Sequence, residues 1–387
     1  MLPERPLIAF PRISNVRFAE SARTISQRNK ISPRKSRQDL ASRRLLCYNV
    51  MGVISMKLTY EQIKSVTLGA QRIEEDGGYV RFFRFCHGDD LAMKSRNSLH
   101  PAGVQLIFDT DATQISLSVF ADDFNDIRFY FAVDVFVNGA YIGAIQNLAD
   151  EDAVGNYGDG KYPLGAYSGE FALGEGDKQV RIVLPHSNAL KIEALALSDA
   201  SYVRPVKKSK VILAYGDSIT QGYDALHPSK TYAMRLADAF DAEIFNKGIG
   251  GASFHPPLAA VVNGIDPDFI TIAYGTNDWT SHTYERISSD AGAFIANVVT
   301  NYPTKPIFVI SPIWRWDIDT EKPSGRFGAV AEILSAICEK YENVTFISGT
   351  NLVPHDGAYF GDLRLHPSDR GFEEFFSGLV NKIKEKL

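Results

Sequence analysis

The sequence predicts two domains: an antiparallel β-sandwich of jelly-roll type over 56–200, followed by a three-layer α/β/α domain with a mostly parallel sheet over 211–387. Three observations lead to this prediction. Short segments of alternating polar and apolar residues fill 79–197, as in strands that bury one face. Beyond residue 211, apolar runs alternate with stretches of helical periodicity, which indicates βα units. Between them, 201–210 contains Pro205 and three lysines and is interpreted as a linker.

In the first domain, turn residues separate the predicted strands. Val137-Asn138-Gly139-Ala140 and the segment 174–177 carry the Asn, Asp and Gly residues that tight hairpin turns require. Evenly spaced short strands with such turns favour a sandwich. The expected strands are 79–85, 104–109, 114–120, 129–137, 179–184 and 190–197.

In the second domain, the predicted strands are continuous apolar runs, as expected of parallel strands buried on both faces. They are 211–214, 243–245, 269–273, 307–310 and 344–347. The predicted helices carry apolar residues three and four positions apart. They are 232–240, 289–299, 327–340 and 371–384.

The first 55 residues differ in composition from the rest. They contain eleven Lys or Arg against three acidic residues, so the remaining residues carry a formal charge of −13 within a net charge of −5. An acidic folded part argues against nucleic acid as a partner. The Arg-rich and Ser-rich segment resembles an organellar transit sequence. We favour the alternative of a disordered or spurious extension, because a globular pattern opens at Met56.

Several protein classes are disfavoured by composition. No run of about 18 apolar residues is present, so we expect no membrane-spanning helix. No secretory signal is recognised, which favours a cytoplasmic location, although the N-terminal segment leaves this open. The three cysteines, Cys47, Cys86 and Cys338, lack metal-ligand spacing, so we expect neither a disulfide framework nor a metal site.

Ser218 stands at a predicted strand-to-helix corner, in Gly216-Asp217-Ser218-Ile219-Thr220 directly after the first strand of the second domain. Such corners lie at the carboxyl edge of an α/β sheet, where these folds place their chemistry, and we expect the serine to be exposed there. Alone, Ser218 is better explained as a helix N-cap. Asp217 is interpreted as a residue that holds the turn.

Three further loops strengthen the catalytic interpretation. The segment 246–251 follows the second strand, 275–278 follows the third, and His366 precedes the last helix. Ester hydrolysis needs a nucleophile, a base beside it and donors for the oxyanion of the tetrahedral intermediate. Serine, histidine, glycine and asparagine supply these parts.

These four blocks, in this order, resemble those of the SGNH, or GDSL, hydrolase family, over about 211–387. The resemblance implies that Ser218 is the nucleophile and His366 the general base. It implies that the amides of Ser218 and Gly251 and the side chain of Asn277 form the oxyanion hole. An acyl-enzyme mechanism of this kind requires no metal and no other cofactor. The matching blocks are 216–220, 246–251, 275–278 and 362–367.

One departure concerns the acid of the triad. The family usually has Asp-x-x-His, whereas Asp362 stands four residues before His366. We expect Asp362 to orient the histidine, because a loop can absorb one extra residue. Asp356, or a Ser-His dyad without an acid, are the alternatives.

The order of the two domains resembles that of family-2 carbohydrate esterases. The resemblance implies a small-molecule or oligosaccharide ester as substrate, with acetyl the expected acyl group, and it leaves the oligomeric state open. Trp279, Trp314 and Trp316 follow strand ends, where they would stack on a sugar or pack in the core. A lipid acyl-ester hydrolase or thioesterase, and a non-catalytic carbohydrate-binding protein, are the other hypotheses.

Overall fold

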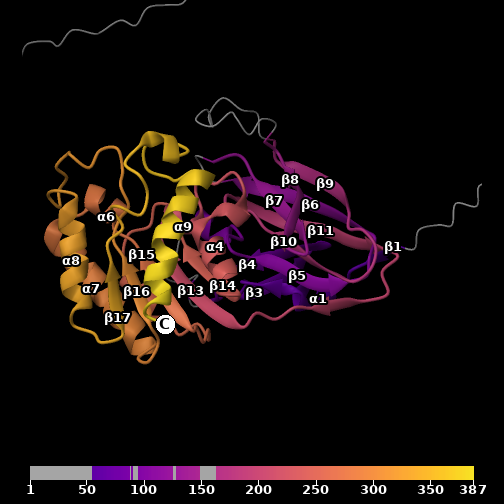
Figure 1. Cartoon of the computed structure of the whole chain (residues 1–387), viewed down its shortest axis with the longest axis horizontal. Helices are drawn as coiled ribbons and strands as arrows, with labels where there is room; N and C mark the ends of the chain where they lie inside the picture. Colours follow the sequence, from indigo (N-terminus) through magenta and orange to yellow (C-terminus); the bar gives the residue numbers. More distant parts are fainter. Residues whose placement is uncertain (1–54, 88, 90–94, 125–127, 149–162) are drawn as a thin grey trace, which may run out of the picture. The chain divides into compact units, whose positions relative to one another are not determined.

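The computed structural model describes residues 55–87, 89, 95–124, 128–148 and 163–387. Residues 51–387 belong to one compact unit. The extension predicted over 1–55 lies outside the described residues, except for Ser55, and stays a prediction. Figure 1 shows two kinds of sheet in this unit, antiparallel strands from the first half of the chain and parallel strands from the second.

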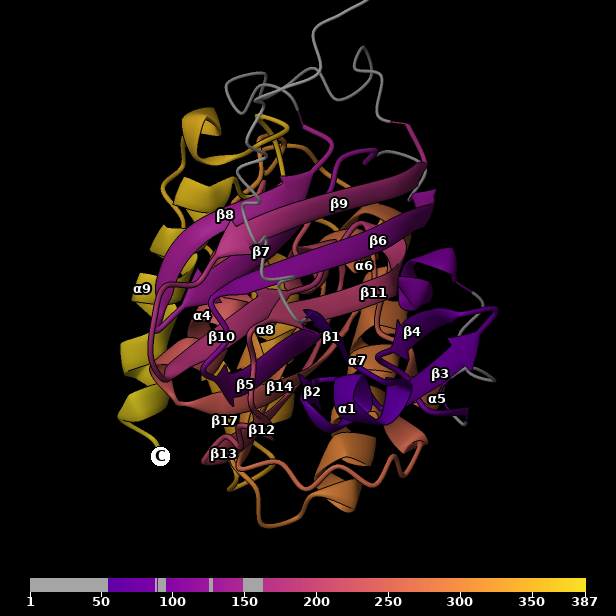
Figure 2. The same cartoon turned by 90° about the vertical axis from the view of Figure 1, so that its right-hand side faces the viewer.

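Two six-stranded antiparallel sheets form the first part of the unit. One sheet contains, in spatial order, β3 (Arg72–Asp76), β4 (Tyr79–Phe83), β11 (Asn188–Ser198), β6 (Gln114–Phe124) and β9 (Gly165–Ala172), with β1 (Ser55–Lys57) paired to β11. The other contains β12 (Val203–Pro205), β5 (Gln105–Thr110), β10 (Lys178–Val183), β7 (Ala132–Val137) and β8 (Ala140–Gln146), with β2 (Thr67–Leu68) paired to β5. Figure 2 looks onto these strands, with β9, β6 and β11 side by side.

The two antiparallel sheets share one hydrophobic core. Leu106 and Phe108 from β5 and Leu117 and Val119 from β6 are all completely buried in the same cluster. Residues two apart point to the same face of a strand, so the alternation in the sequence becomes the inner face of each sheet. The two layers therefore pack face to face.

Strands β8 and β9 have no counterpart among the strands expected from the sequence. Their sequences, AYIGAIQ and GAYSGEFA, are rich in Gly and Ala, which have low β propensity. Pairing with β6 and β7 defines them instead. Gly169 is required where the two layers approach, because a Cβ there would lie 2.9 Å from the side chain of Ile145.

The segment interpreted as a linker is partly a strand. Within 201–210, β12 pairs with β5 through Val203 and Thr110, and Val206 continues the contact by donating its N–H to Ile107. This stretch therefore extends the second antiparallel sheet before the chain enters the parallel one.

The parallel sheet has five strands in the order β14-β13-β15-β16-β17. They are β13 (Lys210–Gly216), β14 (Ala242–Gly248), β15 (Phe269–Ala273), β16 (Ile307–Ile310) and β17 (Val344–Ile347). The chain adds β14 on one side of β13 and all later strands on the other side. The carboxyl end of β13 is therefore the switch point of the sheet, where open α/β sheets bind their ligands.

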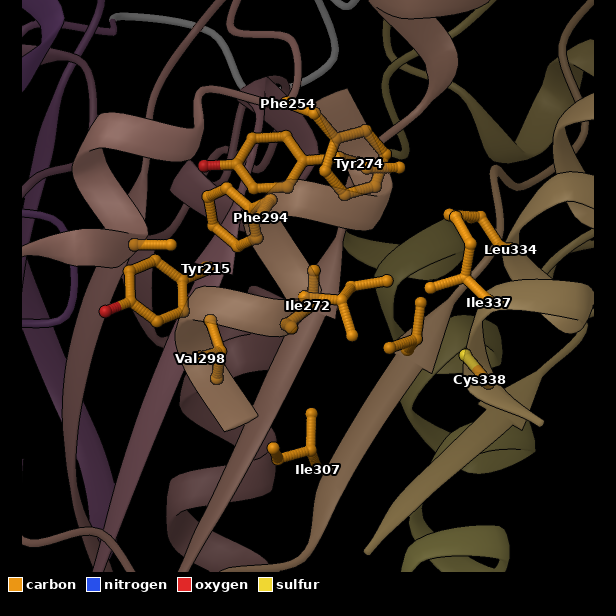
Figure 3. Close-up of a cluster of buried hydrophobic side chains, with 14 of the residues drawn as sticks. Tyr215, Phe254, Ile272, Tyr274, Phe294, Val298, Ile307, Leu334, Ile337 and Cys338 are labelled. Atoms are coloured by element: carbon orange, nitrogen blue, oxygen red, sulfur yellow. The ribbon is translucent and has the colours of Figure 1, made fainter. Parts of the chain in front are cut away.

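Helices cover both faces of the parallel sheet. Ile212 and Ala214 of β13 lie in the core under α4 (Tyr232–Ala239) and α9 (Asp369–Lys384). Leu213 and Tyr215 lie in the opposite core, drawn in Figure 3, under α5 (Pro256–Ala260), α7 (Tyr284–Asn301) and α8 (Gly328–Cys338). The other helices in the described part of the chain are α1 (Tyr60–Ser65), η1 (Arg96–Leu99), α3 (Ser218–Gln221), η2 (Pro228–Lys230), α6 (Thr276–Ser281) and η3 (Gly357–Tyr359). Among the described residues, every helix is too short or too polar to cross a lipid bilayer.

Candidate active site

Ser218 is the first residue of α3 and follows β13 through a tight turn. Asp217 caps the helix, its Oδ1 accepting the backbone N–H of Ile219 at 2.9 Å. Burial raises the pKa of Asp217 to about 7. Gly216 has no room for a side chain, since a Cβ would lie 2.8 Å from the carbonyl oxygen of Ala273. Asp217 thus holds the turn.

Ser218 is buried, with 3% of its surface exposed, in contrast to the exposure expected from the sequence. The antiparallel part packs against α3 and the residues after it. Gln221 donates a side-chain N–H to the carbonyl oxygen of His186, and Tyr130 donates its hydroxyl to that of Ala225. A sequence pattern predicts the sheet edge but not the layer that covers it.

The structure brings Ser218, His366 and Asp362 together. Oγ of Ser218 lies 2.9 Å from Nε2 of His366. On the other side of the ring, Nδ1 lies 2.7 Å from Oδ2 of Asp362. A hydroxyl, an imidazole and a carboxylate joined in this order can move a proton from serine to histidine while the carboxylate holds the ring.

The spacing of four residues between Asp362 and His366 is accommodated by a turn. Oδ1 of Asp362 accepts the backbone N–H groups of Arg364, Leu365 and His366 at 2.8 to 3.1 Å. Leu363 takes a positive φ of 61° to allow this. Burial opposes ionisation of Asp362, but hydrogen bonds from His366 and these amides outweigh it and hold its pKa below the usual range.

Asp356, the alternative acid, has another role in the structure. It precedes η3, and its Oδ1 accepts the backbone N–H of Ala358 at 3.0 Å. It is therefore an N-cap, and the geometry favours Asp362 as the partner of His366.

The end of β14, from which the second loop starts, is held tightly against α3. A Cβ on Gly248 would lie 2.4 Å from the backbone nitrogen of Gln221, so only glycine fits this contact. Asn246 joins the two loops, donating to the carbonyl oxygen of Thr220 at 2.7 Å and accepting from Gly248 at 2.8 Å. Gly251 follows with a φ of 78° and is exposed.

Asn277 links the third loop to the second. It lies in the first turn of α6, and its Nδ2 donates to the carbonyl oxygen of Ala252 at 2.9 Å. An amide nitrogen carries two hydrogens, so this bond leaves one N–H for another acceptor. The contact places the side chain of Asn277 beside the Gly251-Ala252 backbone.

Arg84 is a residue of the site region that the sequence analysis did not single out. It is completely buried, and its guanidinium donates to the carbonyl oxygens of Asn246 at 2.6 Å and Gly248 at 2.8 Å. It also donates to the carbonyls of Asn97 and His100. Burial lowers its pKa to about 9. A side chain from the end of the β4 segment thus braces the loop that leads to Gly251.

Arg128 and Asp224 form a second such contact. The guanidinium of Arg128, which precedes β7, binds both carboxylate oxygens of Asp224 at 2.6 and 2.9 Å. The Asp224 side chain is fully buried, and that of Arg128 is 7% exposed. Burial opposes the charge of Arg128, but the neighbouring Asp224 outweighs it and raises the pKa of the guanidinium. An Arg in a strand-rich segment gives no sequence signal for this pairing.

Three side chains converge beside Arg128. Asp224, Asp362 and His366 each place one carboxylate oxygen or ring nitrogen within 4.8 Å of the others. Nη2 of Arg128 lies 2.9 Å from Asp224, 2.9 Å from His366 and 3.8 Å from Asp362. The guanidinium of Arg128 therefore places a positive charge beside all three groups.

The three tryptophans lie in different environments. Trp279 is completely buried, and its indole N–H donates to the carbonyl oxygen of Gly325, so it is a core residue and not part of a substrate surface. Trp314 is half-buried and stacks on His355. Trp316 is 58% exposed, and its backbone N–H donates to the carbonyl oxygen of Arg364, in the loop between Asp362 and His366.

A cavity of about 400 Å³ lies beside the second loop. Its lining combines backbone of this loop with apolar and polar side chains. The lining residues include Gly251, Ala252, Ser95, Tyr274, His282 and Arg286.

Serine, imidazole and carboxylate in hydrogen-bonded sequence at the carboxyl edge of a parallel sheet are the arrangement of serine hydrolases. Residues 214–373 match the model of the GDSL-like Lipase/Acylhydrolase family. This part of the chain is therefore a GDSL-like acylhydrolase domain, and the protein is an enzyme that acts on ester bonds. No curated protein matches the chain.

Solved structures with the same fold span both parts of the chain. The salicylyl-acyltransferase SsfX3 from a tetracycline biosynthetic pathway has a TM-score of 0.69 at 18% identity, covering 86% of this chain and 97% of its own. A family two carbohydrate esterase from Cellvibrio japonicus has a TM-score of 0.59 at 14% identity, covering 86% and 98%. One from Clostridium thermocellum, in complex with cellohexaose, has a TM-score of 0.59 at 15% identity, covering 83% and 98%.

Proposed function

We propose that this protein is a serine esterase that hydrolyses acyl esters, and in particular acetyl esters of a carbohydrate, through an acyl-enzyme intermediate. The observation that carries the proposal is the pair of contacts from Ser218 through His366 to Asp362, of 2.9 and 2.7 Å. A serine hydroxyl is a weak nucleophile at neutral pH unless a base stands beside it, and this arrangement supplies that base.

The proposed reaction has two halves. Oγ of Ser218 attacks the ester carbonyl carbon while its proton passes to Nε2 of His366. The tetrahedral intermediate collapses, and the leaving alcohol takes the proton from Nε2. Water then gives a proton to Nε2 of His366 and attacks the acyl-serine. When this second intermediate collapses, Oγ of Ser218 takes the proton back from Nε2 and the carboxylic acid is released. Because Nδ1–H donates to Asp362 throughout, Nε2 stays available for the proton.

The oxyanion would be bound by three donors. These are the backbone N–H groups of Ser218 and Gly251 and the second N–H of the Asn277 amide. Support comes from the bond between Asn277 and Ala252, which holds the amide beside the Gly251 backbone. Donors held rigidly before the reaction stabilise the developing charge without reorganising.

Three observations support a carbohydrate as the alcohol part of the ester. The two carbohydrate esterases share this fold over 98% of their own lengths, and one of them was solved with cellohexaose. Trp316 is exposed, and its backbone is bonded to the loop between Asp362 and His366. The cavity lined by Gly251 also offers polar partners for hydroxyl groups in Ser95, His282 and Arg286.

We further propose a division into a jelly-roll domain over 56–200 and a hydrolase domain over 211–387. The strand orders β4-β11-β6-β9 and β5-β10-β7-β8 support the jelly roll, since each sheet alternates strands from the two ends of one rolled hairpin. Separate hydrophobic cores support the division. The pairing of β12 with β5 attaches the start of 201–210 to the first domain.

The test compares acyl groups and alcohols in one set of assays on the full chain. Release of p-nitrophenol is measured from acetate, butyrate and octanoate esters, and release of acetate from acetylated cello-oligosaccharides. We expect acetate to be preferred and Ser218→Ala to abolish turnover, while Ser209→Ala, an exposed serine outside the site, keeps it.

Other outcomes would replace the proposal. A preference for octanoate would favour a lipid acyl-ester hydrolase. Transfer of acetyl to an added sugar faster than to water would favour an acyltransferase. Equal activity in the wild type and Ser218→Ala would reject the role of Ser218, and no turnover in either would favour a carbohydrate-binding protein.

A further inference from the structure

Arg128 reaches the proposed catalytic histidine from the antiparallel part of the chain. Its Nη2 lies 2.9 Å from Nδ1 of His366, 238 residues away in the sequence. The same guanidinium holds Asp224 with two hydrogen bonds, and its Cζ lies 5.0 Å from the centre of the Tyr223 ring. These contacts hold the cation beside the imidazole.

Two carboxylates face the same nitrogen of His366. Oδ2 of Asp362 lies 2.7 Å from Nδ1, and Oδ2 of Asp224 lies 3.9 Å from it. Two negative charges at this range favour the protonated imidazole. A protonated imidazole has no lone pair on Nε2, so it cannot take the proton of Ser218. The site therefore needs a positive charge that offsets one carboxylate.

The guanidinium of Arg128 supplies this positive charge. A guanidinium that binds both oxygens of one carboxylate is held in one plane, and its charge is paired with that carboxylate. Of the two carboxylates that face Nδ1, Asp224 is paired in this way, which leaves Asp362 as the unneutralised one. That charge matches the one positive charge that His366 acquires when it accepts a proton.

We propose that Arg128 is a positioning residue, supplied by the antiparallel sheets, that cancels the charge of Asp224 and keeps His366 neutral and oriented as the base for Ser218. The inference rests on the esterase function proposed above. It gives the first part of the chain a direct role in the chemistry of the second.

The other groups around His366 leave this charge balance in place. Asp362 stands in the loop of the histidine itself, and Ser218, Tyr223 and Asp224 come from α3 and the residues after it. The Tyr223 ring is tilted against the imidazole with ring centres 5.5 Å apart. From the antiparallel part, Arg128 faces the histidine, and the hydroxyl of Tyr130 is turned to the carbonyl of Ala225.

Charge-removing variants of the full chain test the proposal through the pH dependence of kcat/KM for p-nitrophenyl acetate. Arg128→Met removes the cation, and we expect the acid limb of the profile to move up by about 1 to 2 pH units. Asp224→Asn removes a carboxylate and leaves the cation, so the limb should move down. The double variant removes both charges, and its limb should return to within about 0.5 pH units of the wild type.

Controls separate this role from a structural one. Arg181 also belongs to the antiparallel part and pairs with Asp238 of α4 at 2.8 Å, so Arg181→Met should leave the limb in place. If Arg128→Met unfolds, Arg128→Lys is used instead. It keeps the positive charge but loses the paired hydrogen bonds to Asp224, so we expect a smaller upward shift of the acid limb. The proposal would be overturned if Arg128→Met and Asp224→Asn both lose activity and their acid limbs either move in the same direction or do not move.

A second measurement is independent of turnover. The titration of the His366 imidazole is followed by NMR in Ser218→Ala and in Ser218→Ala with Arg128→Met. An upward shift of the titration midpoint in the second variant supports the inference even if the substrate proposal fails. An unchanged midpoint contradicts the inference, while Ser218-dependent ester hydrolysis would still stand.

Discussion

Asp362 holds His366 twice, once through the ring and once through the backbone. One carboxylate oxygen lies 2.7 Å from Nδ1, and the other accepts the backbone N–H of the same residue at 3.1 Å. The backbone bond fixes the position of the His366 main chain, and the side-chain bond fixes the orientation of the imidazole ring. A motif one residue longer than the usual family pattern thereby still brings a carboxylate to Nδ1 of His366.

Replacing Asp362 tests this relationship. Asp362→Asn keeps the size of the side chain but loses its charge and presents an amide to Nδ1, which favours the wrong tautomer of His366. We expect kcat for p-nitrophenyl acetate to fall by about 10³- to 10⁴-fold. Asp356→Ala, which removes only the cap of η3, is the matched control and should keep activity within about threefold. Equal losses in both variants would contradict the assignment of Asp362.

Asn277 is expected to act on the oxyanion. Asn277→Ala should lower kcat by about 10²- to 10³-fold with little change in KM, because the bond to the oxyanion forms only in the transition state. Asn301→Ala is the control, since Asn301 makes the same kind of bond to a backbone carbonyl, that of Ala259, outside the site. Near-normal turnover in Asn277→Ala would refute the role.

Arg84 is expected to determine stability. Arg84→Met removes the guanidinium donor from the buried carbonyl oxygens of His100, Asn246 and Gly248, so we expect the free energy of unfolding to drop by about 3 kcal/mol or more. Urea unfolding followed by circular dichroism measures this. Arg204→Met, at an exposed arginine, should change it by less than about 0.5 kcal/mol. Similar midpoints for both variants would show that the Arg84 brace contributes little.

Asp217 is expected to make stability depend on pH. Its pKa is about 7 in the folded chain because of burial, against 3.8 for an ordinary Asp. Between these values the folded state binds more protons than the unfolded state, so stability falls as pH rises from about 4 to 7. Asp217→Asn keeps the acceptor for Ile219 but removes this dependence.

Comparison of the two proteins isolates the effect of Asp217. The free energy of unfolding of Asp217→Asn should exceed that of the wild type by an amount that grows as pH rises from about 4 to 7, to about 4 kcal/mol at most. Thermal or urea unfolding at several pH values measures the difference. Parallel stability curves for the two proteins would mean that Asp217 titrates normally.

Trp316 is expected to bind the alcohol part of the ester. Trp316→Ala should raise KM for an acetylated cello-oligosaccharide by about 3- to 10-fold, the loss of one aromatic contact. Turnover of p-nitrophenyl acetate should stay unchanged, because its small alcohol does not reach the ring. Tyr284→Ala, at another exposed aromatic residue, serves as control. A KM that does not change for the oligosaccharide would remove Trp316 from the proposed surface.

Much of the parallel sheet follows from short stretches of sequence. The runs 269–273, 307–310 and 344–347 coincide with β15, β16 and β17, because a parallel strand buried on both faces is a continuous apolar run bounded by turn residues. Ser218, Gly251, Asn277 and His366 could be predicted as candidates for a related reason, since each stands just after such a strand or just before a helix. Strands β8 and β9 are not identifiable in this way, because their small residues obtain strand geometry from their neighbours.

The burial of Ser218 and the roles of Arg84 and Arg128 required the folded chain. Arg84 finds its carbonyl partners 162 and 164 residues away, and Arg128 finds Asp224 and His366 at separations of 96 and 238. Local patterns predict helices, strands and turns because neighbouring residues share one backbone geometry. The partners of a buried charged residue depend on how the antiparallel layers pack on the parallel sheet. No short stretch of sequence contains that information.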